Sequence, residues 1–265
     1  ASIVAVGKNA LAFNTTASNN TAVGYQASYS NTTGNSLVAV GDAALKDNTT
    51  GIQNVAVGRN SLENNTSASY NTALGHGTMA TNTTGAQNTA LGYLALLSNT
   101  TASNNTAVGY EAGYSNTTGA QITAVGQSAL KLNTTGAYNN AFGYQTLNDN
   151  TTGNYNAAFG SQALASNTTA SNNTAVGYQA GYTNSTGDAT TAIGTKALRQ
   201  NTTGRFNSVL GYEALYANTT GSYNVALGAA TLRVNTTASN NTAVGYHAGY
   251  ANTTGTGNSY IGYES

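Results

Sequence analysis

The sequence predicts an all-β fold, a parallel β-solenoid with seventeen residues in each turn. The first observation is a glycine that recurs with a seventeen-residue period along the 265-residue chain, without one insertion or deletion. The second is a short triplet such as Thr-Ala-Val before each glycine, and the third is an Asn-Thr-Thr-Gly or Asn-Thr-Thr-Ala corner between triplets. A fixed short period is the signature of a chain that stacks one repeat on the next.

We number the positions of each repeat from 1 to 17 so that the recurrent glycine takes position 5. This spacing predicts about 16 turns, of which the first and last are incomplete, and one repeat domain over residues 1–265 with no separate second domain. The repeat glycines are Gly7, Gly24, Gly41, Gly58, Gly75, Gly92, Gly109, Gly126, Gly143, Gly160, Gly177, Gly194, Gly211, Gly228, Gly245 and Gly262.

Positions 2 to 4 predict the strand of each turn. Position 4 is always Val, Leu, Ile or Phe, position 3 is Ala in fourteen of sixteen repeats, and position 2 is mostly Thr. Alternate side chains of a strand point to opposite faces. We expect the larger apolar residue at position 4, such as Val108, to point into the core. The small residue at position 3, such as Ala107, is then expected on an outer face, packed closely against another strand layer or a second chain.

Positions 8 and 9 form a second apolar step, which is most often Ala-Leu, as in Ala44 and Leu45. Apart from Met79, the Leu is replaced at four places by a much smaller residue, and in each of those repeats position 10 is Tyr. One interpretation is that the Tyr ring fills the volume of the missing Leu, because unfilled core volume lowers stability. The other is that a glycine turn presents the Tyr outward. The four substitutes for Leu are Ser28, Gly113, Gly181 and Gly249.

The expected core is thin, with only about three large side chains in each turn, which is little for a free-standing coil. Together with the Ala position, this predicts that the partner of the chain is itself, in a homo-oligomer of chains packed side by side. The sequence begins and ends within a repeat, and no polar capping segment is seen at either end. Since solenoids normally need such caps, we expect a segment of a longer fibre or a subunit that stacks end to end into a filament.

The composition argues against several classes of function. Charged residues make up 6% of the chain and the formal net charge is zero, so we expect no binding of nucleic acid and no basic surface for membranes. The sequence contains no apolar run long enough for membrane insertion. It contains no Cys, which excludes disulfides and thiolate metal sites. Regularly spaced Val, Leu and Ala argue against disorder.

Catalysis is not expected. The two histidines, His76 and His247, lie ten turns apart, or about 50 Å at the spacing of stacked strands. The acidic residues form no pair repeated at the turn spacing, and no calcium-binding repeat motif occurs. The sequence therefore predicts a chain that is not an enzyme, with no catalytic residues, no metal site and no cofactor.

Asn occupies position 12 in every complete repeat, and two interpretations remain open. Each of these residues begins a formal N-glycosylation motif. Asn amides stacked in register can instead form a hydrogen-bonded ladder, and Asn also favours a corner. These candidates are Asn14, Asn31, Asn48, Asn65, Asn82, Asn99, Asn116, Asn133, Asn150, Asn167, Asn184, Asn201, Asn218, Asn235 and Asn252; further acceptor motifs start at Asn19, Asn64, Asn104, Asn172 and Asn240.

The stacked Thr residues allow a third interpretation, an ice-binding solenoid, because a flat Thr array can order water. Two features argue against it. The adjacent Thr residues at positions 13 and 14 are expected to point in opposite directions. Position 2 is also interrupted, at Val38, Asn140 and Ala157 among others.

Tyrosine is the most abundant aromatic residue, with 18 copies gathered mainly at positions 6, 10 and 17. Position 6 also holds charged residues such as Lys8 and Arg59, so we expect it to face solvent. Four of the five Tyr pairs that join position 6 to position 10 predict an exposed aromatic surface for surface glycans or for host or cell-surface proteins. The alternative is that the rings cover neighbouring turns. The pairs are Tyr25 and Tyr29, Tyr110 and Tyr114, Tyr178 and Tyr182, and Tyr246 and Tyr250.

The words Asn-Thr-Ala-Val-Gly at 105–109, Ala112, and Asn-Thr-Thr-Gly at 116–119 resemble the head repeats of trimeric autotransporter (YadA-like) adhesins. They look still closer to the repeats of bacterial and phage tail-fibre-like proteins, and the resemblance covers essentially the whole chain. It implies a left-handed parallel β-roll, a homotrimer around one axis, and adhesion or fibre function outside the cell. The adhesin repeats are usually shorter than the repeats of this chain, so the details of packing are expected to differ.

From these observations we expect a non-enzymatic, extracellular structural or adhesive fibre segment, an adhesin head or a tail-fibre shaft, located on a cell surface or a virion. One alternative is a glycosylated surface filament or sheath subunit that polymerises end to end. The ice-binding solenoid is the least favoured alternative.

Overall fold

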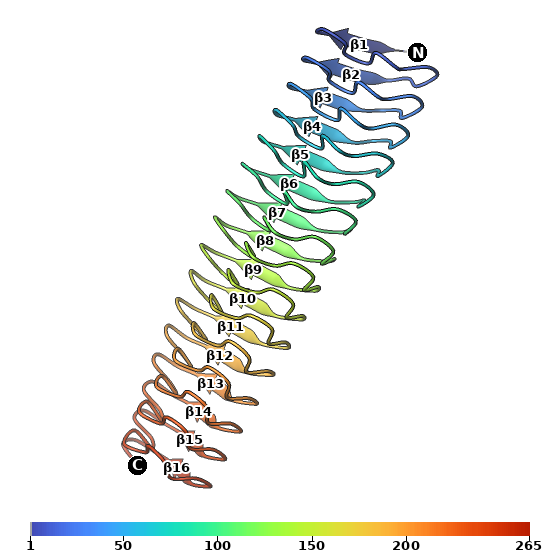
Figure 1. Ribbon diagram of the computed structural model, residues 1–265. Helices are drawn as coiled ribbons and strands as arrows, with labels where there is room; N and C mark the ends of the chain where they lie inside the picture. Colours follow the sequence, from blue (N-terminus) through green and yellow to red (C-terminus); the bar gives the residue numbers. More distant parts are fainter. Residues whose placement is uncertain (1) are drawn as a thin grey trace. The chain divides into compact units, whose positions relative to one another are not determined.

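The computed structural model describes residues 2–265, which form two compact units, 2–135 and 136–265. In the first unit each turn contains one short strand and a long connection that returns the chain to the next strand (Figure 1). Its strands are β1 (Ile3–Val6), β2 (Asn20–Val23), β3 (Val38–Val40), β4 (Val55–Val57), β5 (Thr72–Leu74), β6 (Thr89–Leu91), β7 (Thr106–Val108) and β8 (Thr123–Val125).

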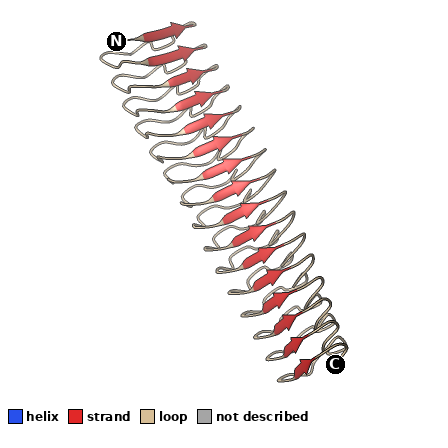
Figure 2. Ribbon diagram, turned by 180° about the vertical axis from the view of Figure 1, so that it is seen from behind, coloured by secondary structure: helices blue, strands red, loops and turns tan. Residues whose placement is uncertain are grey.

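The second unit repeats the arrangement, and within each unit the strands share one side of the coil while loops form the remainder (Figure 2). Its strands are β9 (Asn140–Phe142), β10 (Ala157–Phe159), β11 (Thr174–Val176), β12 (Thr191–Ile193), β13 (Ser208–Leu210), β14 (Val225–Leu227), β15 (Thr242–Val244) and β16 (Ser259–Ile261).

Neighbouring strands within each unit are parallel and follow chain order, and each residue pairs with its equivalent in the next turn, as Ala90 does with Ala107 and Ala175 with Ala192. No helix is assigned in residues 2–265. The predicted all-β parallel β-solenoid, with its seventeen-residue turn, is therefore confirmed. The single domain, the handedness and the trimer stay predictions.

The expected orientation of the strands is wrong. Position 3 lies inside: Ala107 and Ala175 are completely buried. Position 4 lies outside: Val108 is half-buried and Leu91 is 42% exposed. The reason is the narrow interior of so short a coil, where the fully buried Leu of position 9, such as Leu45, and two buried Asn side chains take up the space. A methyl group fits opposite them, and the larger side chain of position 4 projects outward.

The turns that lack Leu at position 9 are filled mainly by side chains other than the Tyr of position 10. At Gly113, the Cδ1 atom of buried Ile122 lies 3.7 Å from the point where a Cβ atom of residue 113 would be, so Ile122 occupies part of the space of the missing side chain. Beside Gly249, the Tyr260 ring is closer still, at 2.6 Å. The Tyr residues of position 10 in these turns are half-buried at the surface. Position 1 departs from its usual Asn in the repeat after each of the first three substitutions, at Leu37, Ile122 and Thr190, so the sequence does contain the signal for this repacking.

The corners depend on residues with positive φ. The repeat glycine has a φ of 136° at Gly41 and 137° at Gly109, a conformation that side chains rarely adopt. At positions 7, 9 and 17 most turns have a residue other than glycine in the left-handed backbone conformation. Examples are Ala43 (φ 54°), Leu45 (φ 51°) and Gln53 (φ 54°). Such residues carry strain that only the surrounding packing maintains, so the coil is held by contacts between turns.

Candidate functional site

The Asn residues of position 12 form a hydrogen-bonded ladder inside the coil. Asn99 is completely buried, and its Nδ2 donates to Asn82 Oδ1 at 2.8 Å and to the carbonyl of Ala102 at 3.0 Å. Its Oδ1 accepts from Nδ2 of Asn116 at 3.2 Å. The same amide-to-amide bond, 2.6 to 3.2 Å long, recurs along both units. One amide per turn thus pins the corner and links it to its neighbours.

A second file of buried Asn, at position 1, is a feature that the sequence analysis missed. Asn88 Oδ1 accepts from the backbone N–H of Asn105 at 2.9 Å, and Asn88 Nδ2 donates to the carbonyl of Ala102 at 2.9 Å. The Ala102 carbonyl therefore accepts two side-chain amides, one from each file. Recurrent Asn two residues before the buried Ala was the available signal. These buried Asn are Asn20, Asn54, Asn71, Asn88, Asn105, Asn139, Asn156, Asn173, Asn207, Asn224 and Asn241.

Burial separates the formal glycosylation sites into two groups. Position 12 is buried from Asn31 to Asn235 and half-buried at Asn14 and Asn252, and a glycan on its Nδ2 would replace a hydrogen used in the ladder. The five additional acceptors are all exposed: Asn19, Asn64, Asn104, Asn172 and Asn240. Glycosylation itself stays a prediction, and its compatible positions are these five.

Expression in a glycosylating secretory host is expected to give folded chains that carry sugar on some of the five exposed acceptors and none on buried Asn99. The physical reason is that a glycan cannot occupy the interior of the coil without breaking about two hydrogen bonds per site. Glycopeptide mass spectrometry of the folded, secreted fraction measures this. Asn104→Gln, which removes one exposed acceptor, is the control, and a glycan on Asn99 in folded protein would contradict the expectation.

The two adjacent Thr files differ in their hydrogen bonding. At position 13 the hydroxyl donates to the carbonyl of its equivalent in the next turn, as from Thr32 to Thr49 at 2.9 Å. At position 14 the side chain is exposed, as in Thr33 and Thr84. Since the position 13 hydroxyls already have protein partners, the pair does not form a two-file Thr array for ordering water. Ice binding stays a prediction that no observation on these residues favours.

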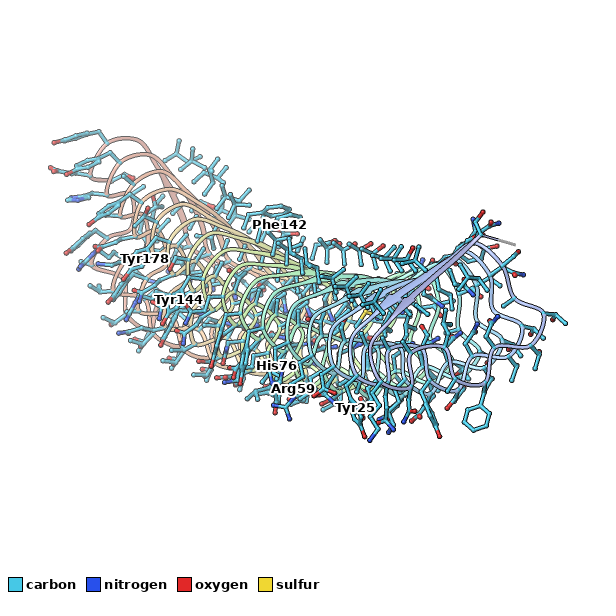
Figure 3. The ribbon with its side chains drawn as sticks, turned by 90° about the horizontal axis from the view of Figure 1, so that it is seen from above. Tyr25, Arg59, His76, Phe142, Tyr144 and Tyr178 are labelled. Atoms are coloured by element: carbon cyan, nitrogen blue, oxygen red, sulfur yellow. The ribbon has the colours of Figure 1, made fainter. Side chains whose placement is uncertain are left out.

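The predicted tyrosine surface is divided between two environments. At position 6 the rings are exposed: 48% for Tyr25 and Tyr110, and 46% for Tyr178 and Tyr246. At position 10 their partners Tyr29, Tyr114, Tyr182 and Tyr250 are half-buried. In the first unit Tyr25, Arg59 and His76 project from one side of the coil (Figure 3). In the second unit Tyr144 and Tyr178 project from one side, and Phe142 projects from the other (Figure 3).

Ring stacking along each unit runs between turns. Tyr93 stacks on Tyr110 with centroids 5.4 Å apart and planes within 11°. At position 17, Tyr138 stacks on Tyr155 with ring centroids 4.8 Å apart and ring planes within 10°. Each ring that stacks in this way covers part of its neighbour's face, whereas among the described residues no ring stacks on Tyr144, Tyr178 or Tyr212.

A file of alternating Tyr and Arg at position 10 runs through five consecutive turns of the second unit. The Arg199 guanidinium lies 5.3 Å from the centroid of Tyr182 and 5.8 Å from that of Tyr216. The Arg233 guanidinium lies 5.4 Å from Tyr216 and 6.0 Å from Tyr250. These distances are typical of cation–π contacts. The file binds neighbouring turns together and explains why the position 10 rings are partly covered.

The acidic and basic residues form ion pairs rather than a reactive cluster. Oε2 of Glu213 lies 2.8 Å from Nε of Arg233, and its Oε1 lies 3.8 Å from Nζ of Lys196. Burial raises the pKa of Glu213, but hydrogen bonds from Arg233 and Tyr212 outweigh it and hold this pKa below its ordinary value. Within residues 2–265 no group of three or more His, Asp or Glu is placed to hold a metal ion. The same residues contain no helix long and apolar enough to cross a membrane.

Comparison of the chain with protein-family models, with curated proteins and with solved structures found no match.

Proposed function

We propose that the chain is a segment of a non-enzymatic, extracellular structural and adhesive fibre whose copies associate side by side, as a homotrimer. The observation that supports this is the outer face of the sheet, formed by positions 2 and 4. No charged residue occurs at either position in any repeat. The position 4 side chains are substantially exposed, for example 42% for Leu91 and 50% for Leu210.

An uncharged face with an exposed apolar side chain in every turn, at position 4, is typical of an interaction surface. In the second unit, Phe142 and Phe159 stack on this face at 4.9 Å, which makes it locally flat and aromatic. The ion pairs lie at other positions, such as that of Arg59 with Asp42 at position 6, on another side of the coil. Lateral association through the apolar face leaves that side free for adhesive contacts, and the ladders inside each coil provide a rigid shaft.

The double variant Leu91→Lys, Leu210→Lys is expected to abolish side-by-side association and leave the coil folded. Both side chains are exposed in the single chain, so their replacement lowers the stability of the coil by less than about 0.5 kcal/mol each. In the interface each Lys would bury an unpaired charge. Sedimentation velocity is expected to show trimers for the unaltered chain and no trimers for the variant, while circular dichroism is unchanged.

The matched control is Thr84→Lys, Thr203→Lys, which places the same charges on exposed position 14. This control is expected to sediment like the unaltered chain. A monomeric unaltered chain at all concentrations would refute side-by-side association. The glycosylated filament stays an alternative prediction, supported by the five exposed acceptors alone.

A further inference from the structure

A two-turn period appears at position 6 of the second unit, over the one-turn period of the fold. Tyr alternates there with small residues, and the Tyr rings are exposed by 45 to 55%. The order along the chain is Tyr144, Ser161, Tyr178, Thr195, Tyr212, Ala229 and Tyr246. We call these four Tyr residues the tyrosine comb and each of their rings a tooth. A slot is the space between two successive teeth, and the small residue between them is its floor.

Stacked rings of position 6 turn their faces toward neighbouring turns, and we infer the same orientation for the rings of the comb. Where two rings follow each other they lie nearly parallel, as Tyr93 and Tyr110 do at 5.4 Å and Tyr246 and Tyr263 do at 5.4 Å and 19°. Between successive rings of the comb the intervening turn holds Ser, Thr or Ala, so no ring of position 6 lies in the three slots. At the end of the comb, Tyr246 is itself stacked by His247 at 3.9 Å and by Tyr263 at 5.4 Å. The slots are thus bounded by aromatic faces on two sides.

The slot width suits one more aromatic ring. Two turns of a parallel sheet correspond to about 10 Å between comb rings. Stacked aromatic rings prefer centroid distances of about 4.5–7 Å. A ring placed halfway between Tyr178 and Tyr212 would therefore lie about 5 Å from each, close to the spacing observed within this chain.

We propose that the comb interdigitates with the comb of a second copy of this chain, so that each slot takes one Tyr ring of the partner. The comb is self-complementary, because its teeth and slots have the same period and are offset by one turn. A two-fold axis perpendicular to the coil maps teeth onto slots, as an isologous contact requires. Interdigitation of identical side chains is also how stacked strands form dry interfaces.

The chemistry of the comb fits an aromatic occupant. Teeth and floors carry no charge, and the hydroxyl groups of Ser161 and Thr195 can bond the phenol groups of entering rings. Beside the comb, Glu213 pairs with both Lys196 and Arg233, which leaves one net positive charge on the three residues. Nε of Arg199 donates to Gln179 Oε1 at 2.9 Å. The first unit lacks this pattern, since Lys8, Asp42 and Arg59 occupy position 6 and Tyr93 stacks directly on Tyr110.

The contact is separate from the apolar sheet face. Position 6 projects from the side opposite to Phe142 of position 4, as Tyr144 and Tyr178 show (Figure 3). The comb would join fibres laterally, and it goes beyond the proposed function because it can exist whether or not the sheet face forms trimers. Its expected strength is that of a small, transient interface.

The test uses the full chain with Leu91→Lys and Leu210→Lys, which removes association through the sheet face. Sedimentation equilibrium of this background is expected to show a concentration-dependent dimer. Thr195→Tyr fills the central slot with a residue that position 6 holds in other turns. It is expected to raise the Kd of the dimer at least about tenfold, because one ring of the partner can no longer stack between two faces. Ala189→Tyr adds the same ring at position 17, where Tyr155 and Tyr223 occur, and is expected to have no effect.

A second measurement identifies the rings in contact. Photo-oxidative coupling by a ruthenium complex and persulfate removes one hydrogen from each of two adjacent phenols and joins them as dityrosine. In an equal mixture of light and heavy-isotope chains, cross-links between Tyr178 and Tyr212 of different chains are expected. A background that stays monomeric would overturn the proposal, as would Thr195→Tyr without effect on the dimer. Binding of cellohexaose that Thr195→Tyr abolishes, with no dimer present, would assign the slots to a saccharide instead and also overturn it.

Discussion

Asn99→Asp is expected to lower the free energy of unfolding at pH 7 by about 3 kcal/mol, the cost of leaving buried polar groups without partners. A carboxylate accepts hydrogen bonds but cannot donate them. The Nδ2 donations to Asn82 Oδ1 and the Ala102 carbonyl would be lost, and three oxygen atoms would face one another inside the coil. The measurement is urea unfolding followed by circular dichroism.

The loss is expected to depend on pH in a defined direction. Burial and the neighbouring oxygen atoms disfavour the charged form, so the pKa of the introduced carboxyl is higher in the folded chain than in the unfolded chain. The protonated form, which can donate one hydrogen bond, predominates in both states below the unfolded Asp pKa of about 3.9. The loss is therefore smallest below that pH, and it grows as pH rises toward and through the raised folded pKa.

The matched control is Asn104→Asp, at an exposed position in the same turn. It is expected to change stability by less than about 0.5 kcal/mol. Equal losses for the two variants, or a loss at Asn99 that does not change between pH 3 and pH 7, would show that the ladder does not support the coil.

Gly109→Ala is expected to destabilise the coil by about 3 kcal/mol, the upper end for a single strained residue. The φ of 137° disfavours any side chain, and a Cβ at this place would lie 2.6 Å from the carbonyl oxygen of Gly126 in the next turn. Since both groups are backbone, the turns must separate to relieve the contact. Faster hydrogen exchange is expected in β7 and β8 than elsewhere in their unit.

Gly262→Ala separates the effect of the positive φ from the effect of the close contact with the next turn. Gly262 has a similar φ of 123°, but a Cβ there would have no neighbouring atom within 4 Å. Its loss is expected to be about 1 kcal/mol, from the backbone conformation alone. Urea unfolding of both variants measures the difference, and equal losses would mean that the close approach of the turns does not limit the size of the residue.

Local chemistry was enough to predict the repeat and its elements. The recurrent glycine, the short strand before it and the Asn-Thr-Thr corner are each set by the conformational preferences of a few adjacent residues. Stacking then follows, because a unit with one very short strand buries its apolar groups only against its neighbours. For the same reason Leu45 and its equivalents, the larger residues of the second apolar step, lie in the interior.

The file of buried Asn at position 1 and the tyrosine comb were not predicted, although both are visible in the sequence once the turns are aligned. Judged by its neighbours in the sequence, Asn88 is simply a polar residue before a strand. Only the closed coil places its amide beside the Ala102 carbonyl. Tyr178 and Tyr212 are separated by two full repeats of the chain, and their relation depends on each turn lying directly on the last.

The sequence by itself determined the period, the strands and the corners of this protein, because these depend on residues close together in the chain. The tertiary structure alone decided which face of each strand is inside. A strand with Ala107 on one face and Val108 on the other has two possible orientations, and side-chain hydrophobicity favours burying Val. The closed coil leaves room for a methyl group only, since Leu side chains and two Asn files already fill it, so Ala is buried and Val is left outside.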